Sequence, residues 1–138
     1  MMKPELLNGG DLAFIGDAYF ELCIRKHVIS KGITNLNILH KECVKYVSAK
    51  GHNQIVQKIR EKFTEAEDTI FRRGRNYNYS SNRKNVDKNE YLNSSGFEAV
   101  IGFLLLSKQQ ERLDEIISEA INIIEEKNEW IHIWKKCS

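Results

Sequence analysis

Residues that break helices are scarce in this chain of 138 residues, which contains a single proline, Pro4, and eight glycines. Proline inside a helix removes a backbone hydrogen bond and clashes with the preceding turn, so a chain almost without it can form long helices. Outside residues 75–90, apolar side chains recur with the spacing of a helix. The length and an apolar fraction of 41% suit one hydrophobic core. The sequence therefore predicts an all-α fold, a single domain over residues 1–138 with about six to seven helices.

The first expected helix, over residues 12–29, is apolar on nearly all of its faces, which is typical of a central, buried helix. Gly32 follows it as a stop signal. A second helix is expected over residues 37–47, and Ser48 is a candidate N-cap for a third. The N-terminal part of the chain is thus predicted to form helices with short connections.

Capping boxes mark two further expected helices. Thr64 and Glu67 have the spacing of such a box, and the helix that they open is expected to end near Gly74. Helical period returns at about Ser94 and continues to residue 106. A second candidate box begins at Ser107, and the last helix extends from it into the C-terminal tail.

A basic segment interrupts this pattern between residues 75 and 90, where apolar period is absent and Asn, Ser, Arg and Lys dominate. Residues 72–91 carry six basic and two acidic side chains, a charge of +4 in a chain whose total is +2. A long basic loop in a compact domain is typical of an element that binds a polyanion. On charge alone, a solvated and flexible loop is the better explanation.

The cysteines and the hydropathy of the chain bear on its location. The three cysteines, at positions 23, 43 and 137, have spacings that fit neither a disulfide framework nor a zinc site. No apolar stretch is long enough to cross a bilayer, and the N-terminal residues lack the apolar core of a signal peptide. The sequence thus predicts a cytoplasmic protein that does not contact a membrane.

Two acidic side chains lie in the most apolar helical segments: Asp17 in LAFIGDAYFEL and Glu98 in GFEAVIGFLLL. Burying an ionised carboxylate is costly without a cation, a metal ion or several hydrogen-bond donors. Two such acids on two core helices could converge on a hard divalent cation, which prefers oxygen ligands. Gly16 indicates a close backbone approach beside Asp17, because glycine within a helix is otherwise unfavourable. Asp17 and Glu98 are therefore candidate metal ligands and catalytic residues.

Ion pairing is the alternative explanation for acids of this kind. Glu21 lies one helical turn after Asp17 and is a candidate supporting residue, but Arg25 at i+4 makes an ion pair equally plausible. Glu98 has no basic residue within a turn on its own helix. The metal interpretation is therefore stronger for Glu98 than for Glu21.

The segments around these acids resemble known motifs. IGDAYFEL resembles the signature helix of the ribonuclease III family, and SSGFEAVIGFLL resembles the second acidic helix of that family. VSAK at residues 47–50 and RRGRN at residues 72–76 look like the smaller members called Mini-ribonuclease III. The resemblance covers roughly residues 7–125, and all four motifs occur in the family's order.

This resemblance implies a homodimeric ribonuclease III-type endonuclease domain without an appended double-stranded-RNA-binding domain. It implies an endoribonuclease that uses Mg²⁺, for which Mn²⁺ can substitute, to hydrolyse double-stranded RNA into products with 5′-phosphate and 3′-hydroxyl ends. The Mini class implies maturation of the 23S ribosomal RNA precursor, with a large-subunit ribosomal protein as a further candidate partner. The dimer contact implied by the family involves the first helix.

Three positions depart from the pattern of ordinary ribonuclease III. Gly10 and Ala13 stand where the ordinary enzymes have glutamates, and Ser95 stands where they have an aspartate. The loss of these outer acids resembles the Mini class. Asp17 and Glu98 are the matched carboxylates that remain, and Ser95 is a candidate supporting residue that could touch a metal-bound water.

Duplex RNA is bound through its shape, phosphates and 2′-hydroxyls rather than through base edges in its deep groove. His40 and Lys50 are candidate RNA contacts, although a lone histidine near a helix is more often structural. Tyr77 and Tyr79 are expected to pack either on sugars or against the protein. The basic side chains expected to bind phosphates are Arg72, Arg73, Arg75, Arg83, Lys84 and Lys88.

Two other functions remain open from the sequence. A non-catalytic helical dimer that binds double-stranded RNA would explain the basic loop but not the two acids. A purely structural helical dimer would place both acids in ion pairs. Cleavage of duplex RNA in the presence of Mg²⁺ separates the enzyme from both alternatives.

Overall fold

The computed structural model describes residues 2–77 and 87–137, and side chains as far as residue 127. Within these residues it is helical, as the sequence predicts, with six α-helices and two short 3₁₀ turns. The helices are α1 (Gly9–Ser30), α2 (Leu36–Val47), α3 (Ala49–Ile59), α4 (Glu65–Asn76), α5 (Lys88–Leu106) and α6 (Gln110–Cys137). The turns are η1 (Pro4–Leu6) and η2 (Arg60–Lys62).

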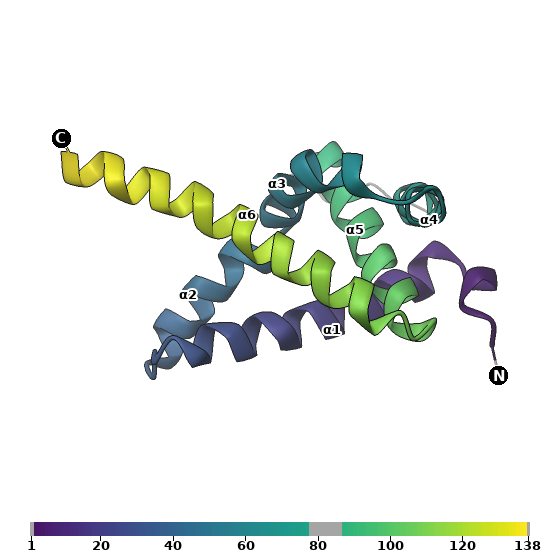
Figure 1. Ribbon diagram of the computed structural model, residues 1–138, viewed down its shortest axis with the longest axis horizontal. Coiled ribbons are helices and arrows are strands. Elements are labelled where there is room, and N and C mark those ends of the chain that lie inside the picture. Colours follow the sequence, from purple (N-terminus) through teal and green to yellow (C-terminus); the bar gives the residue numbers. More distant parts are fainter. Residues whose placement is uncertain (1, 78–86, 138) are drawn as a thin grey trace.

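Helix α5 is the centre of the fold and packs against α1, α3, α4 and α6 (Figure 1). Phe97, Ile101 and Leu104 of α5 are fully buried. The apolar side chains of α5 lie on several of its faces and not on one dominant face. This is typical of a helix that neighbouring helices cover on several sides. Helix α5 therefore sets the positions of the helices that pack around it.

Helix α1 is buried along one stripe only, which corrects the prediction of a helix buried on nearly all faces. Its buried positions recur every four residues, at Leu12, Gly16, Phe20, Ile24 and Val28. Three large apolar side chains of α1 are left exposed, with Phe14 82%, Leu22 55% and Ile29 59% accessible. The apolar character of α1 thus exceeds what packing within one chain uses.

Local hydrogen bonds confirm most of the predicted helix limits. The Ser48 hydroxyl accepts a bond from the Gly51 amide and caps α3, and Thr64 with Glu67 forms the predicted capping box of α4. Gly32 follows the end of α1 with a φ of 85°, a conformation that favours glycine. These limits were predictable because each capping bond joins residues only a few positions apart.

Three predicted limits differ from the structure. Helix α4 continues beyond Gly74 to Asn76, and α5 begins at Lys88, earlier than the Ser94 start that apolar period indicated. The Asp87 side chain caps α5 by accepting bonds from two backbone amides. Ser107 does not open a capping box; its hydroxyl donates back to the Phe103 carbonyl at the end of α5.

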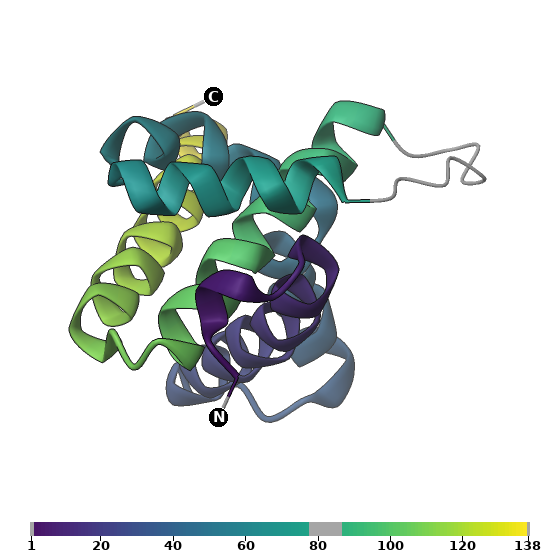
Figure 2. The same ribbon diagram turned by 90° about the vertical axis from the view of Figure 1, so that its right-hand side faces the viewer.

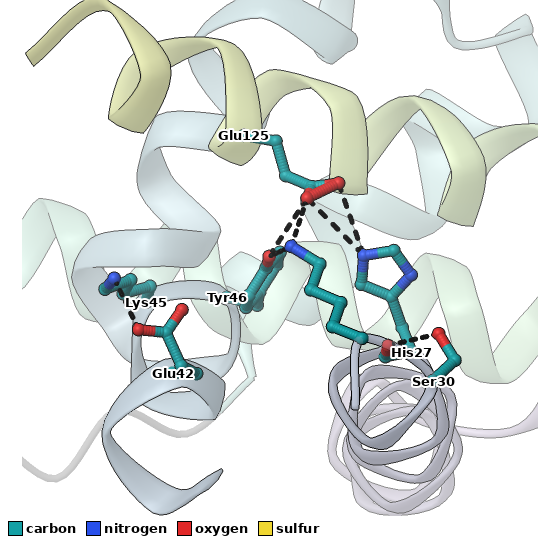
Figure 3. A network of polar contacts seen from close by, with 7 residues as sticks. His27, Ser30, Glu42, Lys45, Tyr46 and Glu125 are labelled. Atoms are coloured by element: carbon teal, nitrogen blue, oxygen red, sulfur yellow. Dashed lines mark hydrogen bonds and ion pairs between the residues drawn. The ribbon is translucent and has the colours of Figure 1, made fainter. Parts of the chain in front are cut away.

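Helix α6 is tied to the corner of α1 and α2 by Glu125 (Figure 3). Its carboxylate lies 2.6 Å from Lys31 Nζ and 3.2 Å from His27 Nε2, and the Tyr46 hydroxyl donates to it at 3.4 Å. Burial alone would raise the pKa of Glu125, but the bonds from Lys31 and His27 hold it below its ordinary value. These contacts fix the middle of α6 on α1 and α2.

The end of α4 and the start of α5 lie side by side at one edge of the molecule (Figure 2). Arg75 links them directly, because its guanidinium donates to the side chains of Asn89 and Asn93. Both edges of the predicted basic loop therefore meet here. None of the described helices has the length and apolarity needed to cross a membrane.

Candidate functional site: a carboxylate pair in an open cleft

An open cleft of about 460 Å³ lies where α1, α5 and the end of α4 meet. Asp17 of α1 and Glu98 of α5 line it, together with Ser95. The structure therefore brings together the two acids that the sequence singles out, although 81 positions separate them along the chain.

The crossing of α1 and α5 is close because small residues face each other there. A Cβ on Gly16 would lie 1.8 Å from the Glu98 carbonyl oxygen, and a Cβ on Gly102 would lie 2.0 Å from the Leu12 carbonyl oxygen. Only glycine fits at these two positions without moving a backbone. The close approach predicted from Gly16 is confirmed, and it places Asp17 beside Glu98.

The two carboxylates differ in exposure. Glu98 is largely enclosed, with 17% of its side chain accessible, whereas Asp17 is exposed on α1. The expectation that both acids are buried is therefore wrong for Asp17. The cause is that Asp17 lies beside the buried stripe of α1, which passes through its neighbour Gly16.

The pKa of Glu98 is raised from 4.5 to about 8. Burial of the carboxylate is the main cause, and the negative charge of Asp17 adds to it. A hydrogen bond from the Ser94 hydroxyl opposes both effects. Ionised Glu98 would thus be destabilised both by burial and by the neighbouring charge of Asp17. A divalent cation bound between the two carboxylates would offset both effects.

No lysine or arginine within the described ranges forms an ion pair with Asp17 or Glu98, although eight ion pairs of lysine or arginine with other acids are present there. The same residues contain no group of three or more Asp, Glu, His or Cys side chains placed to hold a metal. Mg²⁺ is commonly bound by one or two carboxylates with water and substrate phosphates as its remaining ligands. Two adjacent carboxylates could supply the protein ligands of a divalent ion of that kind.

Tyr77 packs beside Gly10, one of the three positions where an acid of the ordinary pattern is absent. A Cβ on Gly10 would lie 2.3 Å from Tyr77 Cε1, so the ring packs directly against the Gly10 backbone. Ala13 lines the same cleft. Of the two roles left open for Tyr77, this geometry favours packing against the protein, while Tyr79 lies outside the described residues.

The two candidate supporting residues lie in different places. Ser95 lines the cleft with Asp17 and Glu98. Glu21 does not line it, and its carboxylate lies 3.1 Å from Arg25 Nη2, which is the ion pair that the sequence left open. Ser95 thus keeps its proposed place at the site, and Glu21 has a partner outside it.

The three arginines near the end of α4 have different environments. Arg73 donates to the Glu5 and Leu7 carbonyls, so it holds the N-terminal segment against α4. Arg75 is engaged with asparagines of α5. Arg72 is exposed, and among the residues that the structure describes its one ion pair is with Asp68, at 3.4 Å. Among these three, Arg72 is the side chain best placed to bind an external anion.

The remaining predicted RNA contacts are scattered. Lys88 is exposed at the start of α5, near the cleft residue Tyr91, and Lys50 lies on α3 in a separate depression with Lys58 and Lys127. His40 lies on α2, in a small apolar hollow that Ile29 also lines. Arg83 and Lys84 lie outside the described residues.

His52 is a residue at the site to which the sequence analysis assigned no role. It is buried, with 1% accessible, and its Nδ1 lies 2.7 Å from the Ser94 hydroxyl that donates to Glu98. A signal was present: positions 52, 55, 56 and 59 form the buried stripe of α3, so a histidine occupies an apolar face.

Known proteins resemble this chain over most of its length. A family model described as the Ribonuclease III domain matches residues 10–109. A Mini-ribonuclease 3 of Streptococcus pneumoniae is 43% identical, covering 91% of this chain and 99% of its own. A Mini-ribonuclease 3 of Enterococcus faecalis is 41% identical, covering 94% and 99%. A crystal structure of a Fusobacterium nucleatum protein superposes with a TM-score of 0.77 at 32% identity, covering 85% of this chain and 93% of that one.

Proposed function

The chain belongs to the ribonuclease III family, among its Mini-ribonuclease 3 members, and is an endoribonuclease, and from this premise we propose that it cleaves double-stranded RNA with a divalent metal ion held by Asp17 and Glu98. The observation that carries this proposal is the pair of adjacent carboxylates in an open cleft, without a lysine or arginine in ion-pair contact in the described part of the chain. The proposed substrate is the 23S ribosomal RNA precursor, and the proposed location is the cytoplasm.

The proposed site binds Mg²⁺, for which Mn²⁺ can substitute. A bound ion of this kind supplies activation of water and neutralises the charge that builds on the scissile phosphate. Asp17 and Glu98 hold it, and Ser95 lies near enough to the cleft to orient a ligand. Hydrolysis is proposed to leave a 5′-phosphate and a 3′-hydroxyl.

A second copy of the chain is proposed to cover the exposed apolar face of α1. Phe14 is 82% accessible and also lines the cleft, and Leu22 is 55% accessible further along the helix. Large exposed apolar side chains gathered on one element are typical of a protein interface. A homodimer would place two cleavage sites on one duplex, one for each strand.

The basic loop and its flanks are proposed to bind the phosphates of the duplex. Arg72 and Lys88 are exposed near the two ends of this loop, on α4 and α5, and Arg83 and Lys84 are assigned to it from the sequence alone. Phosphate contacts release counterions, so binding should weaken steeply with salt. Neutralising Arg83, Lys84 and Lys88 should flatten the salt dependence of RNA binding, and an unchanged slope contradicts their role.

Dependence on a large-subunit ribosomal protein would appear as faster cleavage of the precursor when that protein is added.

The experiment that tests the proposal compares RNA cleavage and RNA binding in matched variants. Wild-type protein with Mg²⁺ should cleave a 23S precursor duplex, whereas Asp17→Asn and Glu98→Gln should bind it and lose cleavage by about 10²-fold or more. Asp11→Asn is the control, since Asp11 is an exposed acid on the same helix outside the cleft. Binding without cleavage by the wild type would instead support a non-catalytic RNA-binding dimer.

A further inference from the structure

His52 is enclosed by aromatic side chains of two other helices. It lies on α3, and its ring centroid is 5.3 Å from that of Phe20 on α1 and 5.1 Å from that of Phe97 on α5. Only 1% of His52 is accessible, so its polar atoms are removed from water. A buried polar group in such surroundings is costly unless it is hydrogen-bonded, which makes the hydrogen bond of the His52 ring informative.

That contact leads to the carboxylate pair. His52 Nδ1 lies 2.7 Å from Ser94 Oγ, and Ser94 Oγ donates to Glu98 Oε1 at 3.1 Å. His52 Nδ1 itself lies 3.9 Å from Glu98 Oε1. Ser94 is also buried, one turn before Glu98 on α5. A continuous chain of polar atoms thus runs from the interior to one oxygen of Glu98.

The direction of these hydrogen bonds, from donor to acceptor, follows from the number of protons available. A hydroxyl has a single proton, so Ser94 donates either to Glu98 or to His52. No polar atom of the described residues bonds to His52 Nε2. If Nε2 carried the proton, a buried N–H would be left without an acceptor, which native structures rarely contain. The proton is therefore on Nδ1, which donates to Ser94, and Ser94 donates to Glu98.

We infer that His52 and Ser94 are positioning residues, which hold the Glu98 carboxylate in the orientation that binds the metal ion. The inference rests on the proposed metal site at Asp17 and Glu98. Ser94 fixes one oxygen of Glu98, which holds the carboxylate in a set orientation beside Asp17. Hydrogen bonds of this kind to a ligand typically change metal affinity by about 10- to 100-fold. The lowered pKa of His52, about 3 because of its burial, is consistent with a neutral ring.

The first test determines which nitrogen of His52 carries the proton. Long-range ¹H–¹⁵N spectra of the metal-free protein distinguish protonated from bare ring nitrogens. His52→Phe identifies the signals of His52 among the four histidines. A protonated Nδ1 and a bare Nε2 are expected. A protonated Nε2 would overturn the inference, because Ser94 would then donate to His52 and not to Glu98.

The second test measures Mn²⁺ affinity in matched variants. Ser94→Ala and His52→Phe should weaken Mn²⁺ binding by about 10-fold or more, and His52→Asn, which retains a donor, should recover part of it. Ser107→Ala is the control, because its hydroxyl bonds to the backbone of the same helix away from the cleft. Thermal unfolding of each variant identifies any general loss of structure.

The outcomes separate this inference from the proposed function. If the wild type binds Mn²⁺ and Ser94→Ala binds it equally well, the positioning role is wrong and the metal site stands. If the wild type binds no Mn²⁺, the metal site is wrong and the inference fails with it. A loss of affinity shared equally by Ser107→Ala would also overturn the inference, because the effect would then not be specific to the His52–Ser94 chain.

Discussion

Gly16 and Glu98 meet at the crossing of α1 and α5, where a Cβ on Gly16 would lie 1.8 Å from the Glu98 carbonyl oxygen. This contact is between backbones, so it fixes the separation of the two helices independently of any side-chain rotamer. Asp17 follows Gly16 directly, and the Glu98 side chain begins at the residue that Gly16 touches. The geometry of the carboxylate pair therefore depends on a glycine that carries no chemistry itself.

Gly16→Ala should destabilise the protein and reduce its activity. At an uncrowded helical position the same change would stabilise by up to about 1 kcal/mol, because alanine favours helix. Here the added methyl group must push α1 and α5 apart, and such overpacking typically costs about 1–3 kcal/mol. Urea unfolding of the variant measures the sign. A variant as stable as the wild type or more stable would show that the crossing is not tight.

Glu98→Gln should change the pH dependence of stability in the metal-free protein. The folded-state pKa of Glu98 is about 8, against 4.5 for an ordinary glutamate, so between these values the folded state binds the extra proton. The free energy of unfolding must then fall as pH rises through this window. The glutamine variant lacks this loss and should be the more stable protein at pH 9. Unfolding in EDTA at several pH values tests this, and parallel curves for the two proteins contradict it.

Arg112→Met should destabilise the protein by about 3 kcal/mol, because it leaves a buried carboxylate without its cation. Glu67 is 2% accessible, and Arg112 donates to both of its oxygens at 2.9 Å. Although burial acts to raise the pKa of Glu67, Arg112 and Thr64 outweigh it and lower that pKa. Glu115 pairs with the same arginine but is exposed, so Glu115→Gln is the control and should change stability little. Equal effects from the two variants would contradict this account.

Arg72→Ala and Arg73→Ala should have opposite signatures. Arg73 donates to two backbone carbonyls of the N-terminal segment, so its loss should lower stability more than RNA affinity. Arg72 is exposed with one ion pair, so its loss should lower RNA affinity and reduce the salt dependence of binding with little change in stability. Unfolding and RNA titrations on both variants check this. Reversed signatures would move the phosphate contact from Arg72 to Arg73.

The helical fold and most helix limits could be predicted because they depend on nearby residues. The Thr64 capping box and the Gly32 stop are set by residues within one or two turns, and both are present. Ser107 shows the limit of such patterns: it has the spacing of a capping box, yet its hydroxyl bonds to the preceding helix. A pattern of spacing alone does not say which of two adjacent helices a side chain caps.

The carboxylate pair was found from the sequence, but its environment was not. Asp17 lies in an apolar segment and yet is exposed. Within one chain, only one stripe of α1 is buried, and apolar residues such as Phe14 are exposed on its other faces. His52 and Tyr77 act through contacts with residues more than 30 positions away, namely Ser94 and Gly10. Such contacts depend on how α3 and α4 pack against α5 and α1, which helical period does not specify.

The most direct test of the central claim locates a divalent ion in a crystal of the protein soaked with Mn²⁺. Anomalous scattering identifies Mn²⁺ independently of the protein atoms. A peak bound by the carboxylates of Asp17 and Glu98 is predicted, and it should vanish in Asp17→Asn crystals grown under the same conditions. An active enzyme whose Mn²⁺ lies elsewhere, with the cleft between α1 and α5 empty, would contradict the account.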